Sequence, residues 1–369
     1  MSLLKKYVTE GFSLIKVDNS EKIIIKKSII KNKEIEKIKT FEYISLAKII
    51  AAFAVVILHT NGAFWSFNFS NYKRYWLSAN IIECIFYFAV PFFALCIGAT
   101  LLDFNEKYGL LKYYYRRIIK VVIPLLFWSF SLYFYRLYVL KNCSKVKLSF
   151  ENLWNLYYKH KVYSIFGSFH TFLEGYMIIP LLAYVEKSKK LKIYLYCFFM
   201  LLITQAIIPY LIKLLNPNLE WVYHINAGYI IYIFAGYIKR KRIFIYILGI
   251  ICLLIHIYGT KILTLKYKSI IKLHKGYLNL YSCSLFLFLK ENTKILSMLI
   301  NPVYINKIGS LTIGSFFMHM PIKDSYLKLF SVNKFSLEFR LFSGIIICFI
   351  SLLITAIIKK IPILKYTVP

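Results

Sequence analysis

Long apolar runs repeat along almost the whole chain and constrain its fold more than any other feature of the sequence. About 20 apolar residues cross a bilayer as a helix, and inside lipid the backbone polar groups must bond to one another. The sequence therefore predicts an all-α fold, a polytopic transmembrane helix bundle of about ten spans. The expected spans are 44–64, 81–102, 118–140, 163–185, 191–213, 222–238, 243–263, 276–290, 308–322 and 341–358, of which the eighth and ninth are short.

The composition supports this class and excludes another. Only 17% of the residues are charged and 59% are hydrophobic, whereas a soluble domain carries about a quarter charged residues. In a soluble protein the net charge of +32 would suggest nucleic-acid binding. Here the basic residues lie mostly between apolar runs, where the membrane surface attracts them. We therefore expect membrane lipids as partners and no nucleic acid.

The distribution of basic residues among the loops predicts the orientation and the domains. With a cytoplasmic N-terminus, the inner loops hold more Lys and Arg than the outer loops, including Arg116, Arg117 and the run at 239–242. This bias favours an N-in/C-in orientation. Residues 1–42 are rich in Lys and have only short apolar clusters. We expect 1–42 to be a cytoplasmic basic arm, either lying on anionic lipid or forming a disordered tail. Residues 43–369 would form one membrane domain.

The cysteines give no sign of a metal or redox site. All seven are scattered, and no Cys or His pair has the spacing of a metal-ligand set. We interpret them as small buried hydrophobic residues, and we expect neither a metal nor a bound cofactor.

Ionisable side chains inside the apolar runs are the first candidates for function, because such groups are costly in a membrane. Lys48 and His59 share one face of the first expected span, since their spacing is close to three helical turns, and they lie about 16 Å apart along its axis. This distance is too long for an acid–base pair but fits two ends of one elongated ligand. Alternatively, Lys48 extends to the headgroups and His59 bonds within the bundle. The other candidates are Glu83, Arg136, His170, Glu174, His224, His256 and His319.

Four motifs, in order along the chain, resemble those of the acyltransferase 3 family of membrane O-acyltransferases. The family opens with Asp, then Arg, Ala and a final His, and Ser45, Lys48, Ala51 and His59 keep that spacing. The stretch at 90–99 is similar to its Val-Pro-x-Phe-Phe-x-x-Ser-Gly motif, and 115–124 is similar to its basic run entering the third helix. The stretch at 312–319 resembles its Thr-Phe-Gly-x-Tyr-Leu-x-His motif. The resemblance covers about 42–358, and the branch that O-acetylates surface polysaccharides and lipid-linked glycans is the most similar.

The resemblance implies an acyltransferase in a bacterial plasma membrane, which moves an acyl group from acyl-CoA to a hydroxyl of a cell-surface polysaccharide or lipid-linked glycan. The family usually transfers acetyl, so acetyl-CoA would be the donor substrate, and a longer acyl group stays open as an alternative. A hydroxyl needs a base to remove its proton, so His59 would act as the base or would itself accept the acyl group. The donor phosphates would bind Lys48, Arg116, Arg117 and Lys120. The acceptor would meet Glu83, Glu174, His170 and His319, and either glutamate could orient His59.

Several positions depart from the family pattern. Ser45 replaces the Asp, Lys48 the Arg, Tyr87 a basic residue before the Val-Pro proline, and Ile97 the Ser of Ser-Gly. The family's His-Leu-Trp-Phe has no clean counterpart, although the stretch at 170–173 could stand in for it. Lysine is not equivalent to arginine at a bidentate site. These departures leave a weakened or repurposed member as an alternative.

Two other classes of function remain open on the sequence. A glycolipid or polysaccharide transporter could line a path with the same charges, although the chain has no repeated halves. A catalytically silent membrane partner in glycan assembly is the third class. His224 and His256 have no family counterpart, and we interpret both as structural.

Overall fold

The computed structural model describes residues 42–70, 72–139, 166–208, 211–212, 229–237, 243–272, 280–293, 295, 301–330 and 332–369. Within these ranges the regular secondary structure is helical, with no β-strand. The predicted basic arm lies outside them apart from Glu42, which begins the first helix and is buried there. His224, one of the candidates from the sequence, also lies outside the described residues.

The described residues form a series of helical elements. After the helix Glu42–Thr60, the elements in chain order are η1 (Gly62–Trp65), η2 (Tyr72–Trp76), α3 (Leu77–Phe86), α4 (Ala89–Leu101), η3 (Phe104–Glu106), α5 (Leu110–Arg117), η4 (Ile118–Val122), α6 (Ile123–Phe134), η5 (Tyr135–Val139), α8 (Phe166–Ala183), α9 (Lys187–Leu202), η6 (Ile203–Ile207), α11 (Ile230–Tyr237), α12 (Ile243–Tyr267), α13 (Leu280–Glu291), α15 (Pro302–Gly309), α16 (Thr312–Leu329), η7 (Phe339–Ser343), α17 (Gly344–Ile358) and η8 (Leu364–Thr367).

In the described part of the chain, 5 helices are long and apolar enough to cross a membrane. Each overlaps an expected span, so the prediction of a helical protein with several membrane-spanning helices is confirmed. The helices α8, α9, α11, α13 and α16 fall on the other expected spans but are shorter or more polar. The number of ten spans and the N-in/C-in orientation stay predictions. The five helices are Glu42–Thr60, Lys73–Glu106, Leu110–Val139, Ile243–Tyr267 and Phe339–Ile358.

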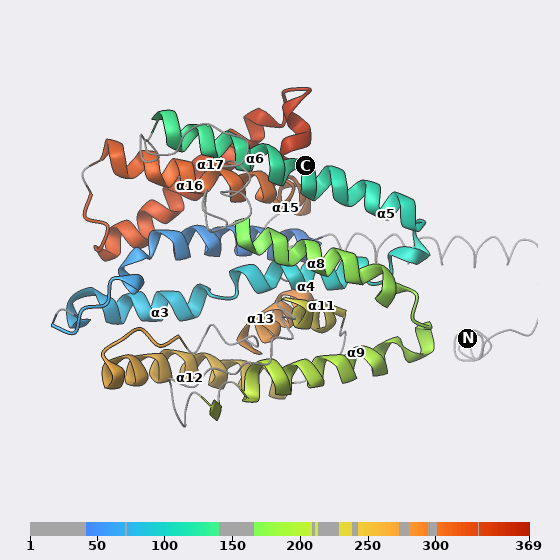
Figure 1. Cartoon of the computed structure of the whole chain (residues 1–369), viewed down its shortest axis with the longest axis horizontal. Helices are drawn as coiled ribbons and strands as arrows, with labels where there is room; N and C mark the ends of the chain where they lie inside the picture. Colours follow the sequence, from blue (N-terminus) through green and yellow to red (C-terminus); the bar gives the residue numbers. More distant parts are fainter. Residues whose placement is uncertain are drawn as a thin grey trace, which may run out of the picture.

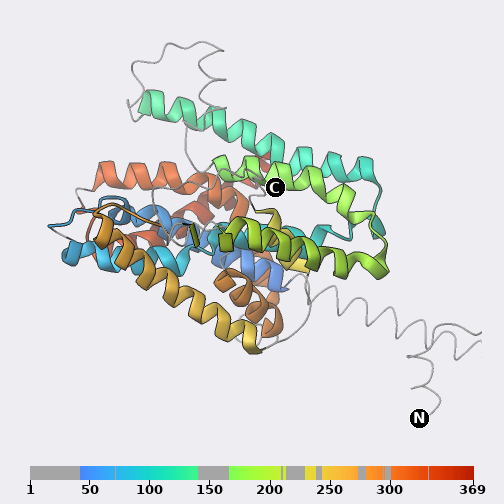
Figure 2. The ribbon, with the colours of Figure 1, turned by 60° about the horizontal axis from the view of Figure 1, so that its bottom comes forward.

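The helices lie roughly along the long axis of the molecule, with α3 and α4 in the middle (Figure 1). In both views α6 and α12 lie on opposite sides of the bundle (Figure 2). Only 17% of the apolar window of α12 is buried, and its exposed side chains include Ile247, Ile251 and Ile255. This surface is what a lipid-facing helix presents.

Small residues let the central helices approach closely. Ala47, Ala51 and Ala54 are fully buried and recur on one face of the first helix. Across the α4–α11 contact, a Cβ added to Gly98 would collide with the backbone carbonyl of Ile233. Small residues at such crossings are typical of membrane bundles, where packing rather than the hydrophobic effect holds helices together.

The ninth expected span, 308–322, has the wrong boundaries. The structure ends α15 at Gly309, begins α16 at Thr312 and continues it to Leu329. Gly309 is where α15 packs against the first helix, since a Cβ there would lie 2.7 Å from that of Ser45. Hydropathy falls after position 322 because polar residues follow, but the helix does not end there.

Candidate active site

Two of the predicted histidines meet at one end of the bundle. The ring centroids of His59 and His319 are 5.1 Å apart, with 38° between the ring planes. His59 lies near the C-terminus of the first helix, and His319 lies within α16. The rings come from segments far apart in the sequence, so only the tertiary fold brings them together. We call His59 and His319 the histidine pair.

The surroundings of His319 define which of its nitrogens carries a proton. Its side chain is fully buried, and its Nδ1 lies 2.6 Å from the carbonyl oxygen of Phe316. A carbonyl oxygen only accepts, so Nδ1 carries the hydrogen and the neutral ring has a lone pair on Nε2. Nε2 is buried without a hydrogen-bond partner among the described residues. His319 therefore presents an unused basic nitrogen beside His59.

A buried polar network holds the residues that follow His59. Asn61 donates from Nδ2 to Glu83 Oε2 (3.2 Å) and accepts at Oδ1 from Arg340 Nη1 (3.4 Å). Arg340 is 1% exposed and also donates from Nη2 to Ser78 Oγ (2.8 Å). Thr60 donates to the backbone carbonyl of Arg340 at 2.8 Å. Glu83 thus bonds to Asn61 beside the histidine pair, and the Asn61 amide links the side chains of Glu83 and Arg340 through two hydrogen bonds.

The predicted donor-binding residues gather elsewhere, in what we call the cation cluster, defined as Lys48, Arg116, Arg117, Lys120 and Lys359. Lys120 is close enough to the other four for their charges to repel its own. Lys359 was not among the predicted site residues. Its ammonium donates to the carbonyl oxygen of Ser310 at 3.1 Å, and burial lowers its pKa. No carboxylate among the described residues forms an ion pair with any of these five cations. Such a group of like charges suits a polyanionic ligand.

Aromatic rings fix the arginines of the cation cluster. The guanidinium carbon of Arg117 lies 5.2 Å from the ring centroid of Tyr176 and 5.7 Å from that of Tyr113, and Arg116 lies 4.5 Å from Tyr108. Tyr113 is fully buried and donates its hydroxyl to the carbonyl oxygen of Tyr176 at 2.8 Å. This bond ties α5 to α8 and sets the direction of Arg117.

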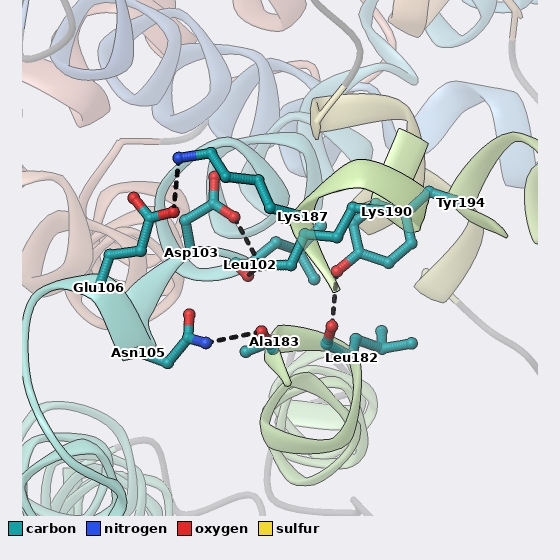
Figure 3. A network of polar contacts seen from close by, with 9 residues as sticks. All are labelled: Leu102, Asp103, Asn105, Glu106, Leu182, Ala183, Lys187, Lys190 and Tyr194. Carbon is teal, nitrogen blue, oxygen red and sulfur yellow. Dashed lines mark hydrogen bonds and ion pairs between the residues drawn. The ribbon is translucent and has the colours of Figure 1, made fainter. Parts of the chain in front are cut away.

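The loop between α4 and α5 is held by the polar contacts of Figure 3. Lys190 is 2% exposed and pairs with Asp103 at 2.8 Å, while it also donates to the carbonyl oxygen of Leu102. Lys187 pairs with Glu106 at 2.9 Å, and this bond raises the pKa of Lys187. Asn105 donates to the carbonyl oxygen of Ala183 at 2.8 Å. The start of α9 therefore anchors the loop that leads into α5.

The first helix connects the two groups. It is continuous from Glu42 to Thr60, so Lys48 and His59 keep the separation of about 16 Å along one face. Lys48 also lies near the thiol of Cys96 on α4. The arrangement can hold a charged ligand at one end of this helix and carry out proton transfer at the other.

Of the remaining candidates, Arg136 lies in η5, and His170 and Glu174 lie on α8. Glu174 is exposed, and Nδ1 of His170 lies 3.0 Å from the carbonyl oxygen of Phe166 in its own helix. The helix itself approaches the histidine pair, because the ring of Phe169 lies 5.1 Å from that of Phe316, which in turn lies 5.6 Å from the ring of His319. The roles predicted for His170 and Glu174 stay predictions.

Ser45, which stands where the family pattern has Asp, has a partner of its own. It is buried and donates its hydroxyl to Asn306 Oδ1 at 2.8 Å on α15. Gly309 packs directly on it, so the pocket around position 45 fits a small side chain. The residues around position 45 therefore fit the Ser that replaces the Asp of the family pattern.

Sequence reasoning missed Arg340, Lys323 and Lys359. Each is an ionisable residue at the edge of an expected span, just before 341–358 or just after 308–322 and 341–358. The rule that selected Glu83 would have selected Arg340 and Lys323 if the spans had the boundaries of the helices.

The chain was compared with known proteins. Residues 41–360 match the model of a protein family described as an acyltransferase domain. Neither a curated protein nor a solved structure matches the chain.

Proposed function

Because the chain belongs to the acyltransferase 3 family, we propose that it transfers an acetyl group from acetyl-CoA to a hydroxyl of a cell-surface polysaccharide or lipid-linked glycan. The family and the apolar helices support a membrane acyltransferase. A bacterial plasma membrane is part of the proposal. One observation carries the proposal. The cation cluster gathers around Lys48 and the histidine pair contains His59, and these two residues lie about three turns apart on the first helix.

The cation cluster would bind the phosphates of the donor. Acetyl-CoA is elongated, with its phosphates at one end and its thioester at the other. With the phosphates at Lys48, Arg117 and Lys120, the pantetheine arm would extend along the first helix towards His59. The separation of about 16 Å along the helix is of the order that such an arm spans.

The histidine pair would carry out the transfer. His59 takes the proton of the acceptor hydroxyl, or itself accepts the acetyl group before passing it on. His319 lies against His59 with its unused Nε2 and would position the acceptor or share the proton. Glu83 would act through Asn61, which it meets directly.

Acetyl transfer is the direct test. Membranes that contain the wild-type chain or His59→Ala at matched amounts are given radiolabelled acetyl-CoA and a preparation of cell-envelope glycans. Label in the glycans with the wild type and none with His59→Ala is the expected result. Equal label with both would remove His59 from the mechanism. No label above chain-free membranes would contradict the proposal and favour the transporter or the silent partner.

A further inference from the structure

Lys323 lies beside the histidine pair, and neither donor binding nor proton transfer as proposed above uses it. It follows His319 by one turn of α16, so both side chains lie on the same face of that helix. Its side chain is 16% exposed. The Lys323 charge is close enough to act on both imidazoles. A cation held in this largely buried place needs a reason, because desolvating it is costly.

The contacts of Lys323 are loose. Its Nζ lies 3.5 Å from the carbonyl oxygen of His59 and 3.9 Å from Oδ1 of Asp324. Both distances are long for an N–H donor, whose preferred distance to oxygen is about 2.9 Å. An ammonium has three N–H groups, so these two contacts leave it able to donate to a ligand. The Asp324 carboxylate is itself 25% exposed and is not in close contact with the ammonium.

We propose that Lys323 is a catalytic residue that stabilises the oxyanion formed during acyl transfer. This inference rests on the proposed function. The histidine base takes the proton of the acceptor hydroxyl, and the hydroxyl oxygen forms a bond to the thioester carbon. The C=O electron pair moves onto the carbonyl oxygen, whose negative charge lies next to the Lys323 ammonium. The C=O bond then re-forms as the C–S bond breaks, and the CoA thiolate takes the proton from the imidazolium.

The position of Lys323 suits this step because the charge it would meet exists only in the intermediate. A fixed cation in a largely buried site needs little reorganisation when the charge appears, and there the attraction is stronger than in water. Loss of one oxyanion donor in an acyl-transfer enzyme lowers kcat about 100- to 1,000-fold. Removing an interaction that is made only in the transition state lowers kcat without raising KM.

The test compares Lys323→Met with Lys328→Met, which removes an exposed lysine of the same helix whose Nζ donates to the carbonyl oxygen of Val139. Both variants and the wild type are assayed for acetyl transfer with varied acetyl-CoA and acceptor. Lys323→Met should lose about 100- to 1,000-fold in kcat with little change in either KM. Lys323→Arg keeps the cation and should retain more activity than Lys323→Met. Lys328→Met should match the wild type.

Other outcomes would overturn the inference. An unchanged kcat for Lys323→Met, or a raised acceptor KM with the same kcat, would mean that Lys323 does not act on the transition state. Binding of radiolabelled acetyl-CoA checks that the protein is folded, and Lys323→Gln replaces Lys323→Met if the latter fails that check. If the wild type transfers acetyl but the lysine variants do so equally well, only this inference fails. A wild type without activity would contradict the proposed function itself.

Discussion

The imidazoles of His59 and His319 lie 5.1 Å apart, centroid to centroid, although 259 positions separate them in the chain. The first helix and α16 supply one ring each, and the Nδ1–H of His319 is fixed by the carbonyl oxygen of Phe316. This contact leaves two basic nitrogen centres in one small region, one of them a buried Nε2 without a partner among the described residues.

Replacement of His319 by Gln should reduce the acetyl-transfer kcat about 100-fold or more, because a general base or its partner contributes about that factor. Gln can still donate a hydrogen bond but cannot take up a proton. The matched control is His256→Gln, a buried histidine on α12 whose Nε2 contacts Cys252. The control should keep its transfer rate. Equal rates for His319→Gln and the control would contradict a role for the histidine pair.

Replacement of Arg117 by Ala should raise the KM for acetyl-CoA about tenfold, since one charge-assisted hydrogen bond to phosphate is worth about that much. The acceptor KM should not change. Lys112→Gln removes an exposed cation of the same helix and should leave both constants as they are. Added salt should weaken donor binding in the wild type more than in Arg117→Ala. A change in the acceptor KM alone would show that Arg117 binds the acceptor and not the donor.

Replacement of Arg340 by Met should lower the free energy of unfolding by about 1–3 kcal/mol, because it leaves the buried Oδ1 of Asn61 without its N–H donor. Thermal unfolding in detergent measures the loss. Lys334→Met, at an exposed lysine of the preceding loop, is the control and should unfold like the wild type. If both variants unfold at the wild-type temperature, the Asn61-bridged network does not stabilise the bundle.

Replacement of Gly98 by Ala should destabilise the protein by about 1–3 kcal/mol, because its Cβ would meet the backbone carbonyl of Ile233 and force α4 and α11 apart. Gly62→Ala is the control, since no heavy atom lies within 4 Å of a Cβ at that position. The same unfolding measurement distinguishes them. Equal stability of the two variants would show that the close contact of α4 and α11 is not needed.

The apolar runs were enough to predict the long spans, because length and hydropathy fix a lipid-crossing helix almost by themselves. The boundaries were harder. A hydropathy run ends where polar residues begin, and Lys323 and Arg340 stand at such ends although their helices continue through them. Two ionisable residues of the site, Lys323 and Arg340, therefore lie just outside the expected spans.

The site was predictable in its parts but not in its assembly. Spacing alone placed Lys48 and His59 on one face of one helix. The contact of His59 with His319 depends on how α16 packs against the first helix, which no periodicity encodes. The bridge from Glu83 through Asn61 to Arg340 likewise joins three segments of the chain.

The central claim is a division of labour along the first helix, with donor binding at the cation cluster and transfer at the histidine pair. The most direct test measures both properties on one purified His59→Ala sample, namely the Kd for radiolabelled acetyl-CoA and the rate of acetyl transfer to the acceptor. We predict a Kd close to that of the wild type and no transfer. A variant that transfers acetyl at the wild-type rate, or that loses donor binding together with transfer, would contradict the claim.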